Sequence, residues 1–469
     1  MSRYDRREFL ADVGRGMLVA GVGSNLALDL GLAPAALAAT EAERLTFGPM
    51  EPLVALMQET PADRLLPAVI GRINAGTDLR QLVAAAALAN ARTFGGQDYD
   101  GYHAIMALAP AYHMSHELPD ERRALPVMKV LYRNTSHIQQ SGGRSHEALH
   151  ALEPAASSAG PPGPEALREA TRRQDMDGAE RAFAALAHEP LDELYNKLQY
   201  VVQDYVDVHR VVLAWRSWAL LDLTGKEHAH TLLRQSVRFC VDEERDIHRY
   251  KNGGEEKLRA LLPKLLDRNS LATRPPGDRV PDDAWIERMC HTIYGSSREQ
   301  AAEAVALALA EGISPEHVGE AISLAANQLV LHDPGRRKED SPKKPVGSVH
   351  GASVGVHASD AANAWRNIAR VSNRRNTYAS LIVGAYHTAG QANGLNPQPY
   401  PFLEHSEKVR SVAPDALLHE TEAAIKANDQ ARACALMHRY GELGQPSTFC
   451  SATPSARMGH CTPRSITVP

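Results

Sequence analysis

The feature that most constrains the fold is the recurrence of alanine and leucine at three- and four-residue spacing. It runs through residues 65–72 and 78–93, and no long stretch alternates apolar and polar residues as a half-buried strand would. Because this spacing gathers side chains on one face of a helix, the sequence predicts an all-α protein. With 469 residues, 43% of them hydrophobic, the chain can bury a large core in a multi-helical, two-lobed body.

Irregular segments divide the chain. A Pro/Ser/Gly/Ala-rich linker at residues 151–165 separates an N-terminal helical lobe, residues 41–150, from a C-terminal helical region, residues 166–445. Residues 446–469 are typical of an irregular tail. We expect the functional site to lie between the two lobes.

Residues 1–38 are typical of a twin-arginine signal peptide. A mildly hydrophobic run and a small-residue cleavage site follow the motif Arg6-Arg7-Glu8-Phe9-Leu10. The run is too short and too polar to span a bilayer. We therefore expect the twin-arginine export machinery as a partner, a periplasmic or extracellular location, and no stable membrane span after cleavage. This route exports folded proteins, often with a cofactor already inserted, so it favours a metalloprotein.

Composition excludes several classes of function. The net charge of −5 argues against a nucleic-acid groove, and neither a P-loop nor a GxGxxG after a strand indicates a nucleotide cofactor. The five cysteines lack the CxxC spacing of zinc ribbons and of c-type haem attachment, although Cys450 and Cys461 are placed to close a small loop in an oxidising compartment. The unusual count is 21 histidines against 7 phenylalanines.

A histidine stands at the opening of each of three apolar stretches. His103 and His209 each follow a pair of aspartates, and the small-residue segment 344–366 carries His350 and His357. Acidic residues suit the first turn of a helix, so each histidine should lie near the start of a buried helix. Imidazole is the commonest metal ligand in proteins. This repeated placement therefore makes these histidines candidate ligands.

A second similarity relates the two halves of the chain. Residues 76–78 (GTD) open the helical pattern LRQLVAAAALANA, and residues 312–314 (GIS) open PEHVGEAISLAAN. Each pattern is followed by one of the histidines at a helix opening. The sequence therefore predicts partly duplicated halves. Equivalent histidines would then converge on one axis, although a duplication would also preserve them without convergence.

We predict that His103, His209 and His350 meet within a few Å of a common point and are joined by His228. Burying several imidazoles without partners is costly, which favours a shared metal ion, although His228 taken alone fits a structural role equally well. In a regular helix His350 and His357 would lie about 10 Å apart along the axis, so only one of them can be a direct ligand. The other should surround the site or contact the substrate, as should Trp215, Trp365, Tyr386 and His387.

One competing motif indicates a zinc peptidase. His146, Glu147 and His150 match HExxH, in which two histidines on one helix bind zinc and the glutamate acts on water. Its context is poor, because a Ser-Gly-Gly-Arg stretch precedes it and Pro154 closes it after about two turns of helix.

The order of the motifs resembles a group of exported bacterial proteins that are distantly similar to the questin oxidase-like family. The motifs are YHAIMALAPAYHM, the proline-rich linker, VDVHRVVLAWRSWALLDLTGKEHAHTLLR and VHASDAANAWR. The resemblance implies an all-helical fold, oxygen-dependent cleavage of a ring substrate, and a histidine-rich non-haem iron centre. By motif it implies His103, His209 and His228 as ligands, with His350 or His357 as the fourth. The modified lysine associated with that centre has no counterpart between His357 and Lys408.

Three functions from different classes follow as expectations. The first is an exported metal-dependent oxidoreductase, with iron favoured over zinc, that acts on a small organic molecule. The second is a non-catalytic helical binding or structural protein, and the third is the HExxH metallopeptidase.

Overall fold

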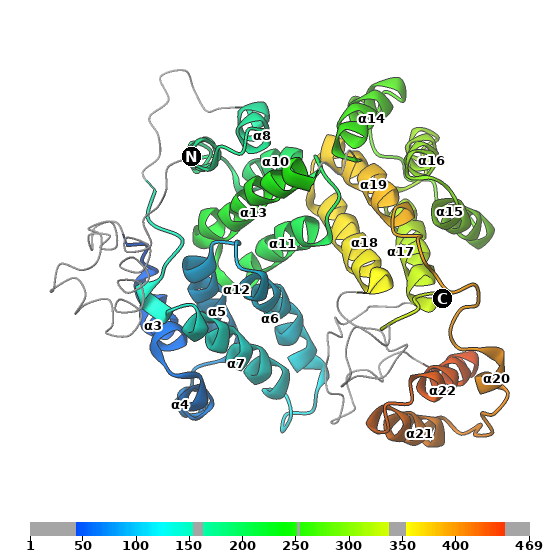
Figure 1. Cartoon of the computed structure of the whole chain (residues 1–469), viewed down its shortest axis with the longest axis horizontal. Helices are drawn as coiled ribbons and strands as arrows, with labels where there is room; N and C mark the ends of the chain where they lie inside the picture. Colours follow the sequence, from blue (N-terminus) through cyan, green and yellow to red (C-terminus); the bar gives the residue numbers. More distant parts are fainter. Residues whose placement is uncertain (1–43, 153–162, 251–253, 337–352, 446–469) are drawn as a thin grey trace, which may run out of the picture.

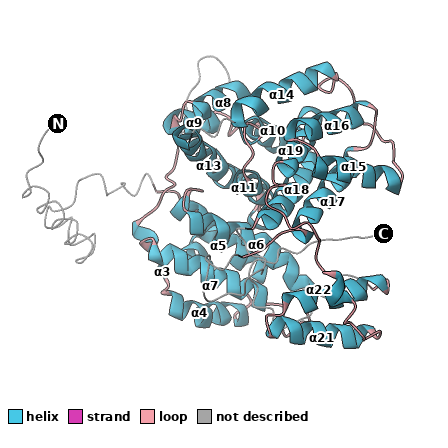
Figure 2. Ribbon diagram, turned by 45° about the vertical axis from the view of Figure 1, so that its right-hand side comes forward, coloured by secondary structure: helices cyan, strands magenta, loops and turns pink. Residues whose placement is uncertain are grey.

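The computed structural model describes residues 44–152, 163–250, 254–336 and 353–445. Every regular element in these ranges is a helix, so the prediction of an all-α protein is confirmed (Figures 1 and 2). The expected signal peptide, most of the linker, the tail with Cys450 and Cys461, and His350 lie outside the described residues.

The N-terminal helices form one side of the body (Figure 1). A capping box in which Asp78 and Gln81 exchange side-chain and backbone bonds begins α5, and Gly95 ends it in the left-handed conformation, with φ of +56°. The next helix continues through Pro110. The bounds are Gly48–Met50 (η3), Glu51–Glu59 (α3), Ala62–Asn74 (α4), Leu79–Phe94 (α5), Tyr99–Glu117 (α6), Leu125–Gln140 (α7) and Gly143–Ser145 (η4).

The middle of the chain supplies the helices that join the two sides. Among them, α11 lies between the helices of the first and last thirds of the body and packs against both α6 and α18 (Figure 1). The bounds are Pro164–Arg172 (α8), Met176–Ala184 (α9), Leu191–Val202 (α10), Val208–Ala219 (α11), Leu221–Thr224 (α12), Lys226–His228 (η5) and Ala229–Tyr250 (α13).

The last two groups of helices differ in how they are held. Helices α14 to α19 share one continuous apolar core with the N-terminal helices, whereas α21 and α22 pack around a small core of their own. The bounds are Gly254–Arg268 (α14), Asp283–Gly295 (α15), Arg298–Ala310 (α16), Pro315–Leu331 (α17), Val354–Val371 (α18), Arg374–Ala389 (α19), Leu403–Ser406 (α20), Pro414–Lys426 (α21) and Gln430–Glu442 (α22).

Two runs of three helices correspond to the sequence similarity between the halves. Helix α5 packs on α6 and α6 on α7, and in the same way α17 packs on α18 and α18 on α19. A glycine with positive φ precedes the first helix of each run, Gly76 at +97° and Gly312 at +84°. Within the described ranges, no helix has both the length and the apolar character needed to cross a membrane.

Candidate histidine site

Three of the histidines singled out in the sequence lie side by side and are half-buried. The ring centroids of His103 and His209 are 5.1 Å apart, and those of His209 and His357 are 5.5 Å apart. They come from α6, α11 and α18, and each lies in the first one or two turns of its helix. The prediction that histidines at helix openings approach one another therefore describes these three side chains.

Asp207 orients the central histidine. Its Oδ1 accepts bonds from the backbone N–H groups of His209 (2.8 Å) and Arg210 (3.0 Å), which caps α11, and lies 3.5 Å from Nδ1 of His209. Burial opposes ionisation, but the contact with His209 and the backbone bond hold the pKa of Asp207 at about 2. The carboxylate is therefore charged, and it draws Nδ1 of His209 toward itself and leaves Nε2 for another ligand.

His103 is held in the same way by a neutral acceptor. Its Nδ1 lies 2.6 Å from the carbonyl oxygen of Tyr99, and because a carbonyl only accepts, Nδ1 carries the proton and Nε2 keeps the lone pair. The ring of Tyr102 lies 4.7 Å from His103 and 5.0 Å from His209. Burial and nearby acidic groups raise the pKa of Tyr102, so its hydroxyl stays protonated.

A buried pair lies behind the histidines. The indole N–H of Trp365 donates to Nδ1 of His387 over 3.2 Å. Burial lowers the pKa of His387 to about 4; the nearby charge of Asp207 raises it, and Arg298 and His357 lower it. His387 is therefore neutral, with its proton on Nε2, and it interacts electrostatically with both Asp207 and His357.

Two other expected surrounding residues make contacts with neighbours outside the three histidines. Trp215 is half-buried against the main core about 9 Å along α11 from His209, at about 1.5 Å per residue. The ring of Tyr386 is covered by the guanidinium of Arg298, 5.4 Å from the ring centroid.

His228 is not part of the cluster. Its ring packs edge-on against Phe47, with 5.7 Å between centroids. It directly precedes α13, and Phe239, which contacts Tyr102, lies about 15 Å further along that helix at about 1.5 Å per residue. The short helix η5 therefore places His228 at the wrong end of α13 to meet the other histidines.

His357 lies near the start of its helix, much as His103 does. His103 is the fifth residue of α6, which follows α5, and His357 is the fourth residue of α18, which follows α17. Of the two alternatives that the sequence leaves open, His357 lies beside His209, and His350 lies outside the described residues.

Residues 146–150 do not form the helix that a zinc peptidase requires. His146 ends the short helix η4, and His150 makes an isolated bridge with Arg44. Glu147 lies 3.3 Å from the guanidinium Nε atoms of both Arg44 and Arg92. The expectation of about two turns of helix is wrong, because this glutamate pairs with arginines and connects the segment to α5 and to the start of the described chain.

Sequence reasoning missed a carboxylate near the site. Glu243, on α13, accepts a 2.8 Å hydrogen bond from Arg210. Burial raises the pKa of Glu243 to about 8, against the lowering effect of Arg210, and the charge of Asp207 raises it further. Asp207 and Glu243 therefore differ in protonation state near neutral pH. Glu243 lies inside a long helix, where no local motif marks it.

The histidines have the chemistry of metal ligands, although they are not assembled around one point. Metal ions lie about 2.1 Å from imidazole nitrogens, which sets ring centroids about 5 Å apart, close to the two separations observed. Bonding of Nδ1 to an oxygen acceptor is also typical of metal-binding histidines. Within the described part of the chain, however, no three His, Cys, Asp or Glu side chains are arranged to hold an ion, so the rings would have to turn.

No protein-family model, curated protein or solved structure matches the chain.

Proposed function

We propose that His103, His209 and His357 bind one transition-metal ion, iron in preference to zinc, and that the protein is an exported metal-dependent oxidoreductase acting on a small organic molecule. The observation that carries the proposal is the contact of three imidazole rings from three helix starts. An iron ion with three imidazole ligands would supply redox chemistry and keep open coordination positions. The resemblance to the questin oxidase-like family and the twin-arginine motif support the same assignment.

The chain's own residues prepare the site for a cation. The carbonyl oxygen of Tyr99 accepts from Nδ1 of His103, and the carboxylate of Asp207 lies 3.5 Å from Nδ1 of His209, which leaves Nε2 of each ring for a metal ion. Asp207 is ionised and supplies one negative charge close to the three rings. Tyr102 packs against the rings of His103 and His209, and Phe239 packs against Tyr102.

A second function is proton transfer without a metal ion. It is favoured by the contrast between Asp207, with a pKa of about 2, and Glu243, with a pKa of about 8. Two nearby carboxyl groups with separated pKa values suit the roles of base and acid. In that function His209 and His387 would relay protons, and the protein would act on its substrate in the absence of any ion.

Metal analysis of the full chain tests the two functions. The protein is purified anaerobically, and its iron and zinc contents are measured by mass spectrometry before and after incubation with Fe²⁺. We expect one ion per chain in the unchanged protein and in His228→Ala, and a loss of that ion in His103→Ala and His357→Ala. Equal metal content in all four proteins, or none in any of them, contradicts the metal site and favours the second function.

A further inference from the structure

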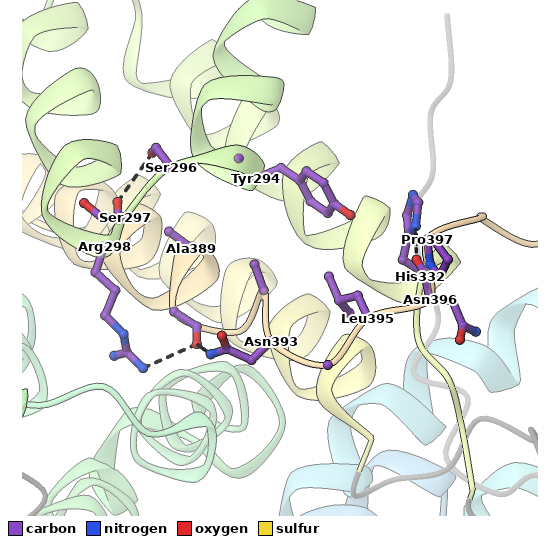
Figure 3. A pocket seen from close by; sticks show the side chains of 14 residues that line it. Tyr294, Ser296, Ser297, Arg298, His332, Ala389, Asn393, Leu395, Asn396 and Pro397 are labelled. Atoms are coloured by element: carbon purple, nitrogen blue, oxygen red, sulfur yellow. Dashed lines mark hydrogen bonds between the residues drawn. The ribbon is translucent and has the colours of Figure 1, made fainter.

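A cavity of about 740 Å³ opens beside the C-terminal end of α19. The turn between α15 and α16 forms one wall, and the loop after α19, residues 390–397, forms another (Figure 3). None of the three clustered histidines lines it, so it is a separate feature of the molecule.

At one end of the cavity, the guanidinium of Arg298 lies beside the side-chain amide of Asn393 (Figure 3). Nη2 of Arg298 and Nδ2 of Asn393 both donate to the carbonyl oxygen of Gly390, over 3.4 and 3.3 Å (Figure 3). These bonds are long, and although the guanidinium also bonds the side chain of Tyr386, its five N–H groups leave donors for a ligand. Among the described residues, no carboxylate lies within ion-pair distance of Arg298. Its positive charge therefore lacks a counterion in this part of the chain.

Gly390 makes room for the guanidinium. A Cβ atom built on Gly390 would lie 2.2 Å from Cζ of Arg298, well inside contact distance. The φ angle of Gly390 is −70°, which any residue adopts, so glycine is required here for space and not for backbone freedom. The absence of a side chain at this position keeps Arg298 at the edge of the cavity.

The other end of the cavity has a different character. Nδ1 of His332 lies 2.7 Å from the carbonyl oxygen of Asn396, so Nδ1 carries the proton and Nε2 is left as an acceptor. The ring of Tyr294 lies 5.6 Å from that of His332. Leu395 lies between the two ends and adds an apolar surface (Figure 3).

We propose that this cavity binds a small organic carboxylate. The carboxylate group pairs with Arg298 and Asn393, because a guanidinium fork matches the geometry of two carboxylate oxygens. The apolar part of the molecule lies against Leu395, and a donor group at its far end meets Nε2 of His332. The proposal does not depend on a metal ion at the histidine cluster.

Isothermal titration calorimetry of the full chain tests the proposal with a matched pair of probes. The probes are 4-hydroxybenzoate and the uncharged 4-hydroxybenzamide, which has nearly the same shape. We expect the acid to bind and the amide to bind at least about tenfold more weakly, since the amide lacks the charge-assisted bonds. Equal binding of the two, or no binding of the acid to the unchanged protein, overturns the proposal. So does inorganic phosphate binding as tightly as the acid, since that marks a general anion site.

Variants of Arg298 and of two glycines in the cavity wall test whether binding needs both the charge and the position of the guanidinium. Arg298→Gln removes the charge, and Gly390→Ala displaces the guanidinium. Both substitutions should therefore weaken the binding of 4-hydroxybenzoate by about tenfold or more. Gly295→Ala is the control, because no atom lies within 4 Å of a Cβ built there, and its affinity should be unchanged. Circular dichroism checks that each variant is folded. If Arg298→Gln misfolds, Arg298→Ala serves instead, and unchanged affinity in a folded variant without the charge overturns the proposal.

Metal content is measured on the same samples. We expect it to be equal in the unchanged protein and in the Arg298 variant. Loss of carboxylate binding with unchanged metal content separates this inference from the proposed function of the histidines.

Discussion

Trp365 donates its indole N–H to Nδ1 of His387 over 3.2 Å, and each side chain is only 1% exposed. Because Nδ1 accepts, the proton of the neutral ring must be on Nε2. The pair thus fixes both the orientation and the protonation state of an imidazole that interacts electrostatically with Asp207 and His357. A buried neutral histidine of this kind makes the stability of the protein depend on pH.

Stability should fall as acid is added because of His387. Its pKa is about 4 in the folded protein and 6.5 in the unfolded chain, so between these values only the unfolded chain binds the proton. His387 therefore makes its full contribution to the free energy of unfolding above pH 6.5. That free energy falls by about 3 kcal/mol in all as the pH is lowered toward 4. Urea unfolding at a series of pH values measures it. His387→Phe should show a shallower dependence, and an unchanged slope would contradict the assigned protonation state.

Replacing Asp207 should separate its two roles. Asn retains an oxygen that accepts from the start of α11, so Asp207→Asn should cost little stability, whereas Asp207→Ala should cost about 1 kcal/mol through the lost cap. Both remove the charge beside His209, so both should weaken Fe²⁺ binding by about 10- to 100-fold. Thermal unfolding and an anaerobic Fe²⁺ titration measure the two effects. Full Fe²⁺ affinity in the Asn variant would show that the carboxylate is not needed.

Histidines at equivalent places in the two halves should behave alike. His103 and His357 each lie one contact away from His209, so His103→Ala and His357→Ala should give similar losses of bound Co²⁺, a spectroscopic substitute for iron. The absorption spectrum of the Co²⁺-loaded protein measures this. His228→Ala should leave the spectrum intact, because that ring packs on Phe47 instead. A loss in His228→Ala equal to the other two would contradict the three-histidine site.

Glu147 should matter for stability and not for chemistry. Glu147→Gln breaks two ion pairs of a nearly buried carboxylate, so the free energy of unfolding should fall by about 1–3 kcal/mol. His146 is exposed, and His146→Ala should change the free energy of unfolding by less than about 0.5 kcal/mol. Chemical denaturation measures both. Zinc bound by the unchanged protein and lost in His146→Ala would restore the peptidase interpretation.

A glycine allows the close approach of α5 to α6, the helix that carries His103. A Cβ atom on Gly101 would lie 2.5 Å from the ring of Phe94, so Gly101→Ala should destabilise the protein by about 1–3 kcal/mol. Gly71, inside α4, has open space around it, and Gly71→Ala should stabilise by about 0.5–1 kcal/mol. Thermal unfolding compares the two. Equal effects at both positions would mean that the close approach of α5 and α6 is not required.

Local patterns predicted the helices and the placement of individual histidines within them. The acidic residues before His103 and His209 mark helix starts. The repeated pattern that precedes α5 and α17 related residues 76–103 to 312–350, and His350 lies outside the described residues. The same patterns do not predict which helices pack together in the folded protein. Whether His228 meets His209 depends on which end of α13 faces α11, and no local pattern records that.

Interactions between distant segments explain the other differences. The HExxH spacing fits a helix, but pairing of Glu147 with Arg44 and Arg92 holds residues 146–150 in an irregular path. Glu243 lies near Asp207 only because α13 crosses α11. Side chains that depend on such crossings have no sequence signal in a single chain.

The small separate core of α21 and α22 affects how unfolding of this protein can be observed. All four tryptophans, at positions 215, 218, 285 and 365, belong to the main core or pack against it, whereas the second core contains Leu417, Ala424, Leu436 and Tyr440. Helices with a core of their own can melt as an independent cooperative unit. Intrinsic tryptophan fluorescence would then follow the melting of the main body alone, while far-ultraviolet circular dichroism would record both transitions. A mismatch between the two melting curves would show, without any mutation, that α21 and α22 melt independently of the main body.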